Sequence, residues 1–191
     1  MEAWKEAVEY VLAREGGFVS NDNDSGGATN FGISLRFLRS VHEDRLRRYA
    51  FFVTVEKLTA KDIESLTREQ AEIIYKGEFW DVARFGDIAN DGVRNYVFDC
   101  TVLHGLRQGI KILQRAMWGV LRGRDLFHDD GVLGDVSIQN VNILTKDKNF
   151  LASLTTALIT ERAGFCRLLA AVRPKDEVFL DGWLSRCYRW A

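Results

Sequence analysis

One carboxylate near the N-terminus stands where a general acid would be useful. Glu15 follows a segment in which Trp4, Val8 and Val11 recur at helical spacing, and two glycines come directly after it. Paired glycines commonly end a helix, so we expect a helix over residues 2–15 with Glu15 in its last turn. The negative end of a helix disfavours an ionised carboxylate, and partial burial adds to that effect. A carboxylic acid that keeps its proton can act as a general acid.

The segment after the glycines, residues 18–34, predicts a small β-hairpin. It combines a short apolar run, a polar glycine-rich turn and a returning strand over residues 28–33. Folded over the helix end, the hairpin would bring Asp24 or Thr29 within water-bridging distance of Glu15. An acid that faces a second group able to hold a water is what glycoside hydrolysis requires. The alternative is that Glu15 is a solvated last-turn side chain and that Asp24 only caps its own turn.

These two segments resemble the opening motif of glycoside hydrolase family 108. The resemblance is carried by Glu15-Gly-Gly-Phe18 and by Asp24-Ser-Gly-Gly-Ala-Thr-Asn-Phe-Gly-Ile33. Members of that family are small lysozyme-like N-acetylmuramidases of phages, prophages and bacterial secretion clusters, and some are regarded as secretion activators. The order and spacing of Glu15, Asp24 and Thr29 are also similar, within one residue, to the Glu, Asp, Thr series of the phage lysozymes.

The resemblance continues along most of the chain. It includes four further segments: Tyr75-Lys-Gly-Glu-Phe-Trp80, Val97-Phe-Asp-Cys-Thr-Val-Leu-His104, Asp130-Gly-Val-Leu-Gly134 and Gly182-Trp-Leu-Ser-Arg186. The chain departs from the family at Asp22 and Ser25, where the family often has proline, and at residues 135–137, where it commonly has proline and lysine. The N-terminal motif is therefore intact, and the C-terminal part matches less well.

The resemblance implies cleavage of the β-1,4 bond between N-acetylmuramic acid and N-acetylglucosamine, with peptidoglycan glycan strands as the partner. Glu15 would protonate the leaving oxygen. Asp24 or Thr29 would position the attacking water or stabilise the oxocarbenium-like transition state, and no cofactor is required. Whether the anomeric centre inverts depends on the separation of the carboxyl groups, which the sequence does not give.

Three further residues are the expected sugar contacts. Asn30 and Phe31 lie on the hairpin, and Trp80 offers an aromatic face to a pyranose ring. The alternative for Trp80 is core packing. Glu78 is a rival acid that we expect to be a surface charge.

Two other function classes remain open. The first is a non-catalytic peptidoglycan-binding or secretion-accessory protein with a lysozyme fold, although such a protein would not need Glu15, Asp24 and Thr29 together. The second is another glycan-cleaving reaction, either lytic transglycosylation, which leaves anhydro-sugar ends, or chitin hydrolysis. The masses of the products distinguish these reactions.

Composition and charge limit the classes of partner that we expect this protein to bind. The net charge of −1 over 191 residues gives no general electrostatic case for nucleic acid or an anionic membrane. No apolar run approaches the roughly 20 residues that span a bilayer, and the N-terminus lacks the apolar run of a secretory signal. We therefore expect synthesis in the bacterial cytoplasm and action in the periplasm or cell wall. The family resemblance implies release by a holin or holin-like partner.

Hydrophobic spacing and capping residues predict a mainly α fold. Ser34 is an expected helix N-cap, residues 59–62 and 67–70 resemble capping boxes, and Ser137 is an expected cap for a short helix. Residues 93–104 are apolar on nearly all sides and should form a buried central helix.

With the resemblance, this gives a lysozyme-like helical bundle with one small β-hairpin and two lobes around a cleft. Residues 1–90 would form the catalytic lobe. Residues 91–191 would form a helical lobe that resembles the family's peptidoglycan-binding-like region.

The polar groups of the central helix have structural interpretations. Asp99 would be buried and should pair with an arginine such as Arg94. Cys100 and His104 could share a helix face, but two ligands do not make a zinc site, so we expect no metal. The chain has three cysteines, Cys100, Cys166 and Cys187. So few, and an odd number, indicate reduced buried thiols.

Overall fold

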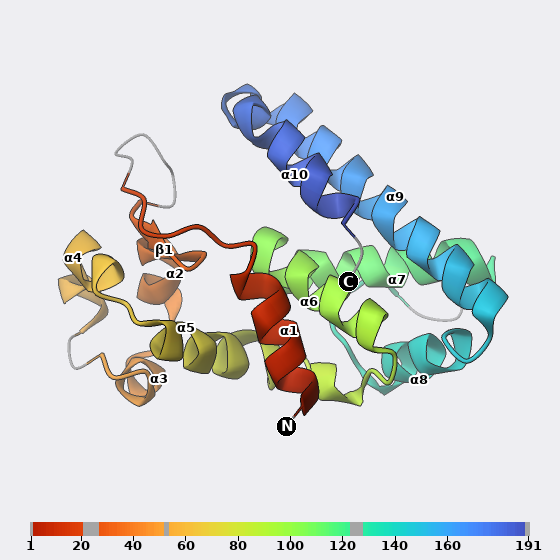
Figure 1. Ribbon diagram of the computed structural model, residues 1–191, viewed down its shortest axis with the longest axis horizontal. Coiled ribbons are helices and arrows are strands. Elements are labelled where there is room, and N and C mark those ends of the chain that lie inside the picture. The colour runs from red at the N-terminus through yellow and green to blue at the C-terminus, as the bar shows by residue number, and fades with distance from the viewer. Residues whose placement is uncertain (1, 21–26, 52–53, 123–127, 190–191) are drawn as a thin grey trace. The chain divides into compact units, whose positions relative to one another are not determined.

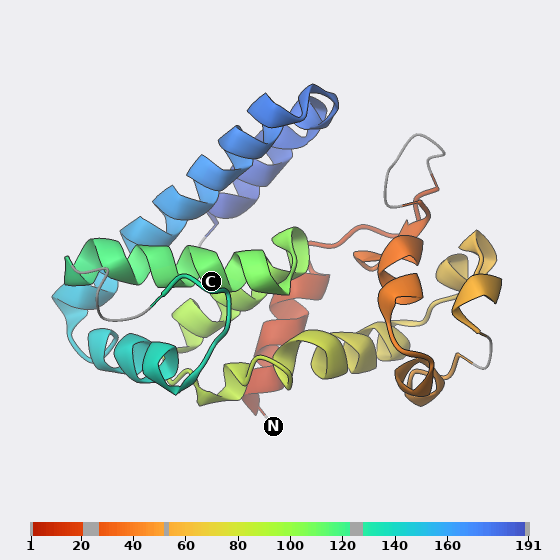
Figure 2. The same cartoon turned by 180° about the vertical axis from the view of Figure 1, so that it is seen from behind.

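The computed structural model describes residues 2–20, 27–51, 54–122 and 128–189. The chain folds into two compact units, Met1–Val82 and Ala83–Ala191 (Figures 1 and 2). Helices dominate both units, and two short antiparallel strands form a small hairpin in the first unit. The predicted fold class, mainly α with one small N-terminal hairpin, is confirmed.

The first unit consists of short helices and the hairpin. In chain order its elements are α1 (Glu2–Leu12), β1 (Thr29–Asn30), β2 (Ile33–Ser34), α2 (Leu35–Ser40), α3 (Glu43–Arg48), the 3₁₀ helix η1 (Val55–Lys57), α4 (Ala60–Glu64), α5 (Arg68–Tyr75) and the π-helical turn η2 (Lys76–Trp80).

Side chains at the helix starts explain why several of these elements begin where they do. The Ser34 hydroxyl accepts a hydrogen bond of 3.1 Å from the Phe37 N–H, which makes Ser34 the N-cap of α2, as predicted. At α5 the Thr67 hydroxyl accepts from the Gln70 N–H, and the Gln70 amide oxygen accepts from the Thr67 N–H. This reciprocal capping box is also confirmed.

The hairpin differs from the prediction in its turn. Thr29 pairs with Ser34 and Asn30 with Ile33, so the chain reverses at Phe31-Gly32 instead of continuing as one strand over residues 28–33. Phe31 has φ of 50° and Gly32 has φ of 75°. Two consecutive positive values are typical of the type I′ turn that matches the twist of a two-residue hairpin.

A second, earlier pairing joins Val19 to Thr29. The two residues exchange backbone hydrogen bonds of 2.8 Å as an isolated antiparallel bridge. Residues 21–26, and with them Asp22, Asp24 and Ser25, lie outside the described residues.

The second unit is built from longer helices. Its elements are the 3₁₀ helix η3 (Phe85–Asp87), α6 (Asp91–His104), α7 (Leu106–Leu121), α8 (Asp135–Leu144), α9 (Lys148–Val172), the 3₁₀ helix η4 (Pro174–Phe179) and α10 (Leu180–Cys187).

Helix α6 is the buried central helix that the apolar run predicted. Residues 93–101 are all buried. Gly105, with φ of 87°, separates α6 from α7, and the two helices run side by side in both views (Figures 1 and 2). A Cβ at Gly109 of α7 would lie 2.5 Å from the backbone nitrogen of Thr101, so glycine is what allows this close approach.

Ser137 does not cap α8. The helix begins at Asp135 after Gly134, and Ser137 is buried inside it. Its hydroxyl accepts a hydrogen bond of 3.3 Å from the side-chain amide of Gln114, which also donates to the carbonyl of Val132. Ser137 therefore provides a hydrogen-bond acceptor for the buried side-chain amide of Gln114 in α7. The residues around Ser137 in the sequence do not reveal this role.

Asp99 does not pair with Arg94. Its carboxylate accepts hydrogen bonds of 2.7 Å from Arg162 of α9 and Arg186 of α10. Arg94 instead bonds the carboxylate of Asp91 at 2.7 Å. Five residues along a helix turn the side chain by about 140°, so positions 94 and 99 face different sides of α6.

Candidate active site

Glu15 lies directly after α1, in a turn that continues the helical bonding. The Glu15 N–H donates a hydrogen bond of 3.2 Å to the Val11 carbonyl, and the Ala13 N–H donates one of 2.9 Å to the Glu9 carbonyl. The helix is thus shorter than the predicted range of residues 2–15, and Glu15 lies in the turn that follows it and not in the helix. The side chain is partly buried, so it is both positioned and reachable.

The Glu15 carboxylate packs against the hairpin turn. A Cβ built on Gly32 would lie 2.5 Å from Oε2 and 2.6 Å from Cδ of Glu15. The positive φ of 75° at Gly32 also disfavours any other residue. A side chain at position 32 would thus strain the backbone, and it would also force the Glu15 carboxylate to move.

Tyr75 holds the same turn through its hydroxyl. Its hydroxyl donates a hydrogen bond of 2.7 Å to the Phe31 carbonyl, and its oxygen lies 2.6 Å from the position of a Gly32 Cβ. The side chain is 1% exposed and packs against Phe79, with ring centroids 5.7 Å apart. In the sequence, Tyr75 stood out only as the first residue of a family-like segment, with no sign of this role. The Phe-Gly pair between two short strand segments is the local signal that could have indicated a tight turn here.

Thr29 and Asn30 lie on β1, just before the turn. Thr29 is partly exposed, and its hydroxyl donates a hydrogen bond of 3.5 Å to the Gly27 carbonyl. Asn30 is 6% exposed, and its amide donates to the carbonyls of Ile63 at 3.1 Å and Glu64 at 3.3 Å. The Asn30 amide thus satisfies carbonyls at the end of α4 and fixes the hairpin to that helix.

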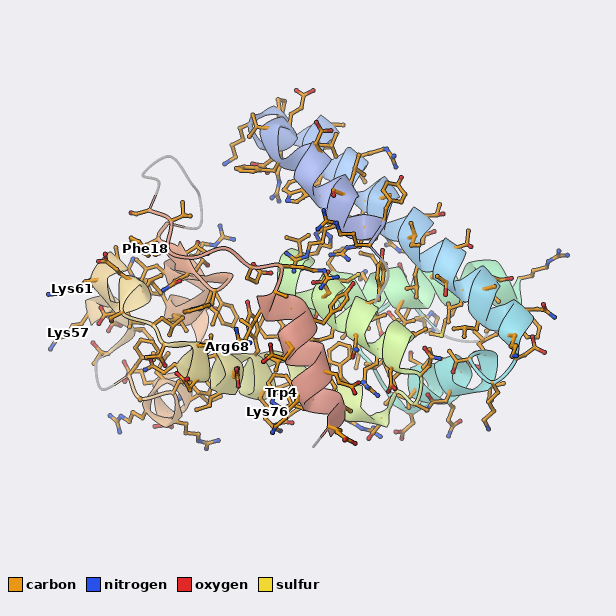
Figure 3. The ribbon with its side chains drawn as sticks, in the orientation of Figure 1. Trp4, Phe18, Lys57, Lys61, Arg68 and Lys76 are labelled. Carbon is orange, nitrogen blue, oxygen red and sulfur yellow. The ribbon has the colours of Figure 1, made fainter. Side chains whose placement is uncertain are left out.

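Phe31 and Trp80 have different surroundings. Phe31 is partly exposed at the turn, while Trp80 is 6% exposed. The Trp80 ring meets Trp4 edge to face, with centroids 5.3 Å apart and an interplanar angle of 65° (Figure 3 labels Trp4). Of the predicted site residues, Phe31 lies near Glu15, because it precedes Gly32, the residue against which the Glu15 carboxylate packs. Trp80 packs against Trp4. Asp24 lies outside the described residues.

Glu78 is not a surface charge, contrary to expectation. Its side chain is 8% exposed, and its carboxylate forms an ion pair of 2.9 Å with Arg45. The Tyr49 hydroxyl donates a second bond of 2.6 Å. Burial, followed by this bond to the Glu78 carboxylate, raises the pKa of Tyr49 above its ordinary value. Glu78 is thus occupied by two partners that lie far from it in the sequence.

A second buried polar cluster lies in the other unit, around Asp99. Burial opposes ionisation of Asp99, but hydrogen bonds from Arg186 and Arg162 outweigh it and hold the pKa of this carboxyl below its usual range. Burial, helped by the charge of Arg162, lowers the pKa of His104 to about 3. His104 is therefore neutral, and its Nε2 lies 3.5 Å from Nε of Arg162.

In the part of the chain that the structure describes, no group of three or more His, Cys, Asp or Glu side chains is arranged to hold a metal ion. Burial raises the pKa of Cys100 to about 12, which keeps its sulfur as a thiol. No helix among these residues is both long and apolar enough to span a membrane.

Comparison with known proteins gives a family and a fold. The family model for glycosyl hydrolase 108 matches residues 8–105, which include the end of α1, the hairpin and α5. The chain is also similar to a solved protein, the subject of "Structure of Brucella abortus SagA", with a TM-score of 0.70 and 24% identity over 96% of this chain and 88% of that one. At this identity the likeness shows the fold. A search of curated protein sequences gave no match.

Proposed function

This chain belongs to glycosyl hydrolase family 108, and from that premise we propose that it is a peptidoglycan hydrolase with Glu15 as its general acid. The bond cleaved is the β-1,4 link between N-acetylmuramic acid and N-acetylglucosamine. The proton of Glu15 passes to the glycosidic oxygen as its bond to the anomeric carbon breaks. A water then supplies the hydroxyl group to that carbon, and no cofactor takes part.

The contact between Glu15 and Gly32 is the observation that carries this proposal. A general acid has to be held within a fraction of an ångström of its productive position. Here the carboxylate fills the space that a Cβ at Gly32 would occupy. The turn itself is fixed by the Tyr75 hydroxyl on the Phe31 carbonyl. A solvated last-turn glutamate would have no such packing against a second element.

Thr29 and Asp24 are the proposed partners of the acid. Thr29 is a partly exposed residue paired on β1, two residues before the turn that Glu15 contacts. We assign one of these two side chains to the attacking water or to the oxocarbenium-like transition state.

Among the expected sugar contacts, Phe31 is the best placed, because it is partly exposed next to the turn. The surroundings of Asn30 and Trp80 favour positioning roles, since one bonds the end of α4 and the other packs on Trp4.

The substrate determines where the protein would act. Glycan strands of peptidoglycan lie outside the inner membrane, so we propose action in the periplasm or cell wall. Release through a holin or holin-like partner is part of the same proposal.

The test is digestion of purified peptidoglycan by wild type, Glu15→Gln and Glu9→Gln in parallel. Glu9 is a matched control because it is an exposed carboxylate on α1 that pairs only at the surface with Arg68, at 2.6 Å (Figure 3 labels Arg68). Soluble fragments are reduced and weighed by mass spectrometry.

We expect reducible muramic acid ends from wild type and Glu9→Gln, and none from Glu15→Gln. Anhydro ends would indicate a lytic transglycosylase instead. If all three proteins pelleted with the wall and released no fragment, the chain would be a binding or secretion-accessory protein. Wild-type activity in Glu15→Gln would contradict the assignment of the acid.

A further inference from the structure

Two buried cysteines are in contact between α9 and α10. The Sγ atoms of Cys166 and Cys187 lie 3.8 Å apart, which is van der Waals contact for two sulfurs. Neither residue is exposed, and with Ala163 they form the centre of a small apolar cluster. The side chains packed against this cluster are Leu180, Trp183 and Leu184 of α10.

Small side chains explain how the two helices come so close. Ala163, Cys166 and Ala170 are buried on one face of α9, at the spacing of a single helical stripe. Helix α10 lies alongside that half of α9 in both views (Figures 1 and 2). The two thiols therefore face each other across a narrow contact.

The backbone of Cys187 is held in place by α6. The buried Tyr96 hydroxyl donates a hydrogen bond of 2.8 Å to the Cys187 carbonyl. The preceding residue, Arg186, bonds both oxygens of Asp99. Cys187 is thus presented to Cys166 by contacts that do not involve either sulfur.

We infer that Cys166 and Cys187 are an oxidation site, at which an external disulfide converts the two thiols into a disulfide that ties α10 to α9. The oxidant is a reactive disulfide, either that of a thiol oxidase or glutathione disulfide. One cysteine thiolate attacks a sulfur of the oxidant, forms a mixed disulfide and displaces a thiolate. The second cysteine then attacks the mixed disulfide and displaces the other thiolate. Two electrons and two protons leave the protein, and the oxidant is reduced to two thiols.

The hydrogen bond between the two sulfurs favours the thiolate of whichever one accepts it, and either sulfur can be the donor. The nearby charge of Arg162 also favours a thiolate at either position. Either cysteine can therefore attack the oxidant first, and the other then resolves the mixed disulfide. Nε2 of neutral His104 lies 3.8 Å from the Cys166 sulfur, but it accepts a hydrogen bond from Arg162 and holds no proton, so the protons of the two thiols pass to solvent.

Access is provided by the position of Cys187 at the end of α10, since terminal helical turns open more readily than helix centres. The disulfide would close a loop between residues 21 positions apart and would stabilise the α9–α10 pair by restricting the unfolded chain. The chemistry of the pair stands apart from the proposed cleavage. If the protein acts in the periplasm or cell wall, we expect the oxidation to happen there too. That expectation alone rests on the proposed function.

Oxidation of the full, reduced chain with glutathione disulfide tests the inference. After oxidation the protein is alkylated, unfolded, alkylated again and digested with trypsin. Cleavage places Cys166 in the peptide of residues 163–167, Cys187 in residues 187–189 and Cys100 in residues 95–107. We expect the first two peptides to be joined, with Cys100 alkylated only after unfolding. The Tm should rise by about 5 °C, and dithiothreitol should reverse the rise.

Variants separate the pair from the third cysteine. Cys166→Ser and Cys187→Ser should give neither a linked peptide nor a rise in Tm, whereas Cys100→Ser should retain both. The inference fails if the folded wild type keeps both thiols free overnight, retains glutathione without linkage, or links either cysteine to Cys100. Peptidoglycan digestion by the same samples keeps the two proposals distinguishable, because the linked peptide is detected whether or not cleavage occurs.

Discussion

The Glu15 carboxylate packs against the backbone of Gly32, at the place where a side chain on that residue would begin. The position of a Cβ on Gly32 lies 2.5 Å from Oε2 of Glu15. This contact joins the turn after α1 to the tip of the β1–β2 hairpin. It explains why an acid and a glycine that are 17 positions apart in the chain belong to one site. It also means that the position of the acid depends on a residue that has no side chain.

Gly32→Ala should therefore reduce activity more than stability. The new methyl group would displace the carboxylate, and a shift of about 1 Å at a catalytic group costs roughly 100-fold in rate. The positive φ should cost about 1 kcal/mol of unfolding free energy. Peptidoglycan turbidity and thermal unfolding measure the two effects.

Gly27→Ala is the matched control for this change. Gly27 has a similar φ of 72°, but among the described residues a Cβ there would meet only Leu35, at 3.8 Å. It should lose similar stability and keep most of the activity. Equal loss of activity in both variants would mean that backbone strain, and not the carboxylate contact, is responsible.

Tyr75→Phe should weaken the same site without disturbing the core. The change removes one hydroxyl whose bond of 2.7 Å fixes the Phe31 carbonyl, and it keeps the packed ring. We expect a loss of about 1 kcal/mol in unfolding free energy and a reduced rate of glycan cleavage.

Tyr96→Phe provides the comparison, because that hydroxyl also donates to a backbone carbonyl, at 2.8 Å, in the other unit. It should lose comparable stability with unchanged cleavage. A similar fall in cleavage for the two variants would contradict a specific role for Tyr75.

The features that the sequence predicted correctly depend on near neighbours. Ser34 caps α2 through a residue three positions later, and Thr67 and Gln70 do the same at α5. The apolar run of α6 likewise reports burial on all sides without reference to any other element. Local chemistry decides these elements, so a single sequence is enough to find them.

The features that the sequence missed depend on distant residues. Glu78 is buried because Tyr49, 29 positions away, donates to it. Asp99 finds Arg162 and Arg186 at separations of 63 and 87 positions. Which arginine reaches a buried carboxylate is decided by helix packing, and several arginines satisfy the local pattern equally well. The pinning of the hairpin turn by Tyr75, 44 positions from Phe31, was missed for the same reason.

Asp99→Asn should strongly destabilise the second unit. Arg162 and Asp99 have fully buried side chains, so a neutral partner would leave the Arg162 charge uncompensated. Removing one member of such a pair costs about 3–5 kcal/mol. Denaturant unfolding of the variant measures the loss. Asp91→Asn is the control, because Asp91 has a 68% exposed side chain in its pair with Arg94. A loss below about 1 kcal/mol in Asp99→Asn would contradict the assigned burial of the network.

His104 should make stability depend on pH in a specific window. Burial and then the charge of Arg162 lower its folded pKa to about 3, whereas an unfolded histidine titrates near 6.5. Between these values the unfolded chain binds the proton and the folded chain does not. The stabilising contribution is therefore complete above about pH 6.5 and is lost as the pH falls toward 3. The slope from this one group is at most about 1.4 kcal/mol per pH unit.

Denaturant unfolding of wild type and His104→Gln between pH 7 and pH 4 tests this dependence, with His42→Gln as the control because the His42 side chain is 71% exposed. The unfolding free energy of wild type and of His42→Gln should fall as the pH decreases, and His104→Gln should lose most of that slope. Asp99 adds little over this range, because its depressed folded pKa makes its contribution disappear only below about pH 4, where an unfolded aspartate takes up its proton. An unchanged slope in His104→Gln would mean that His104 is protonated in the folded chain, which is incompatible with Arg162 donating to its ring nitrogen.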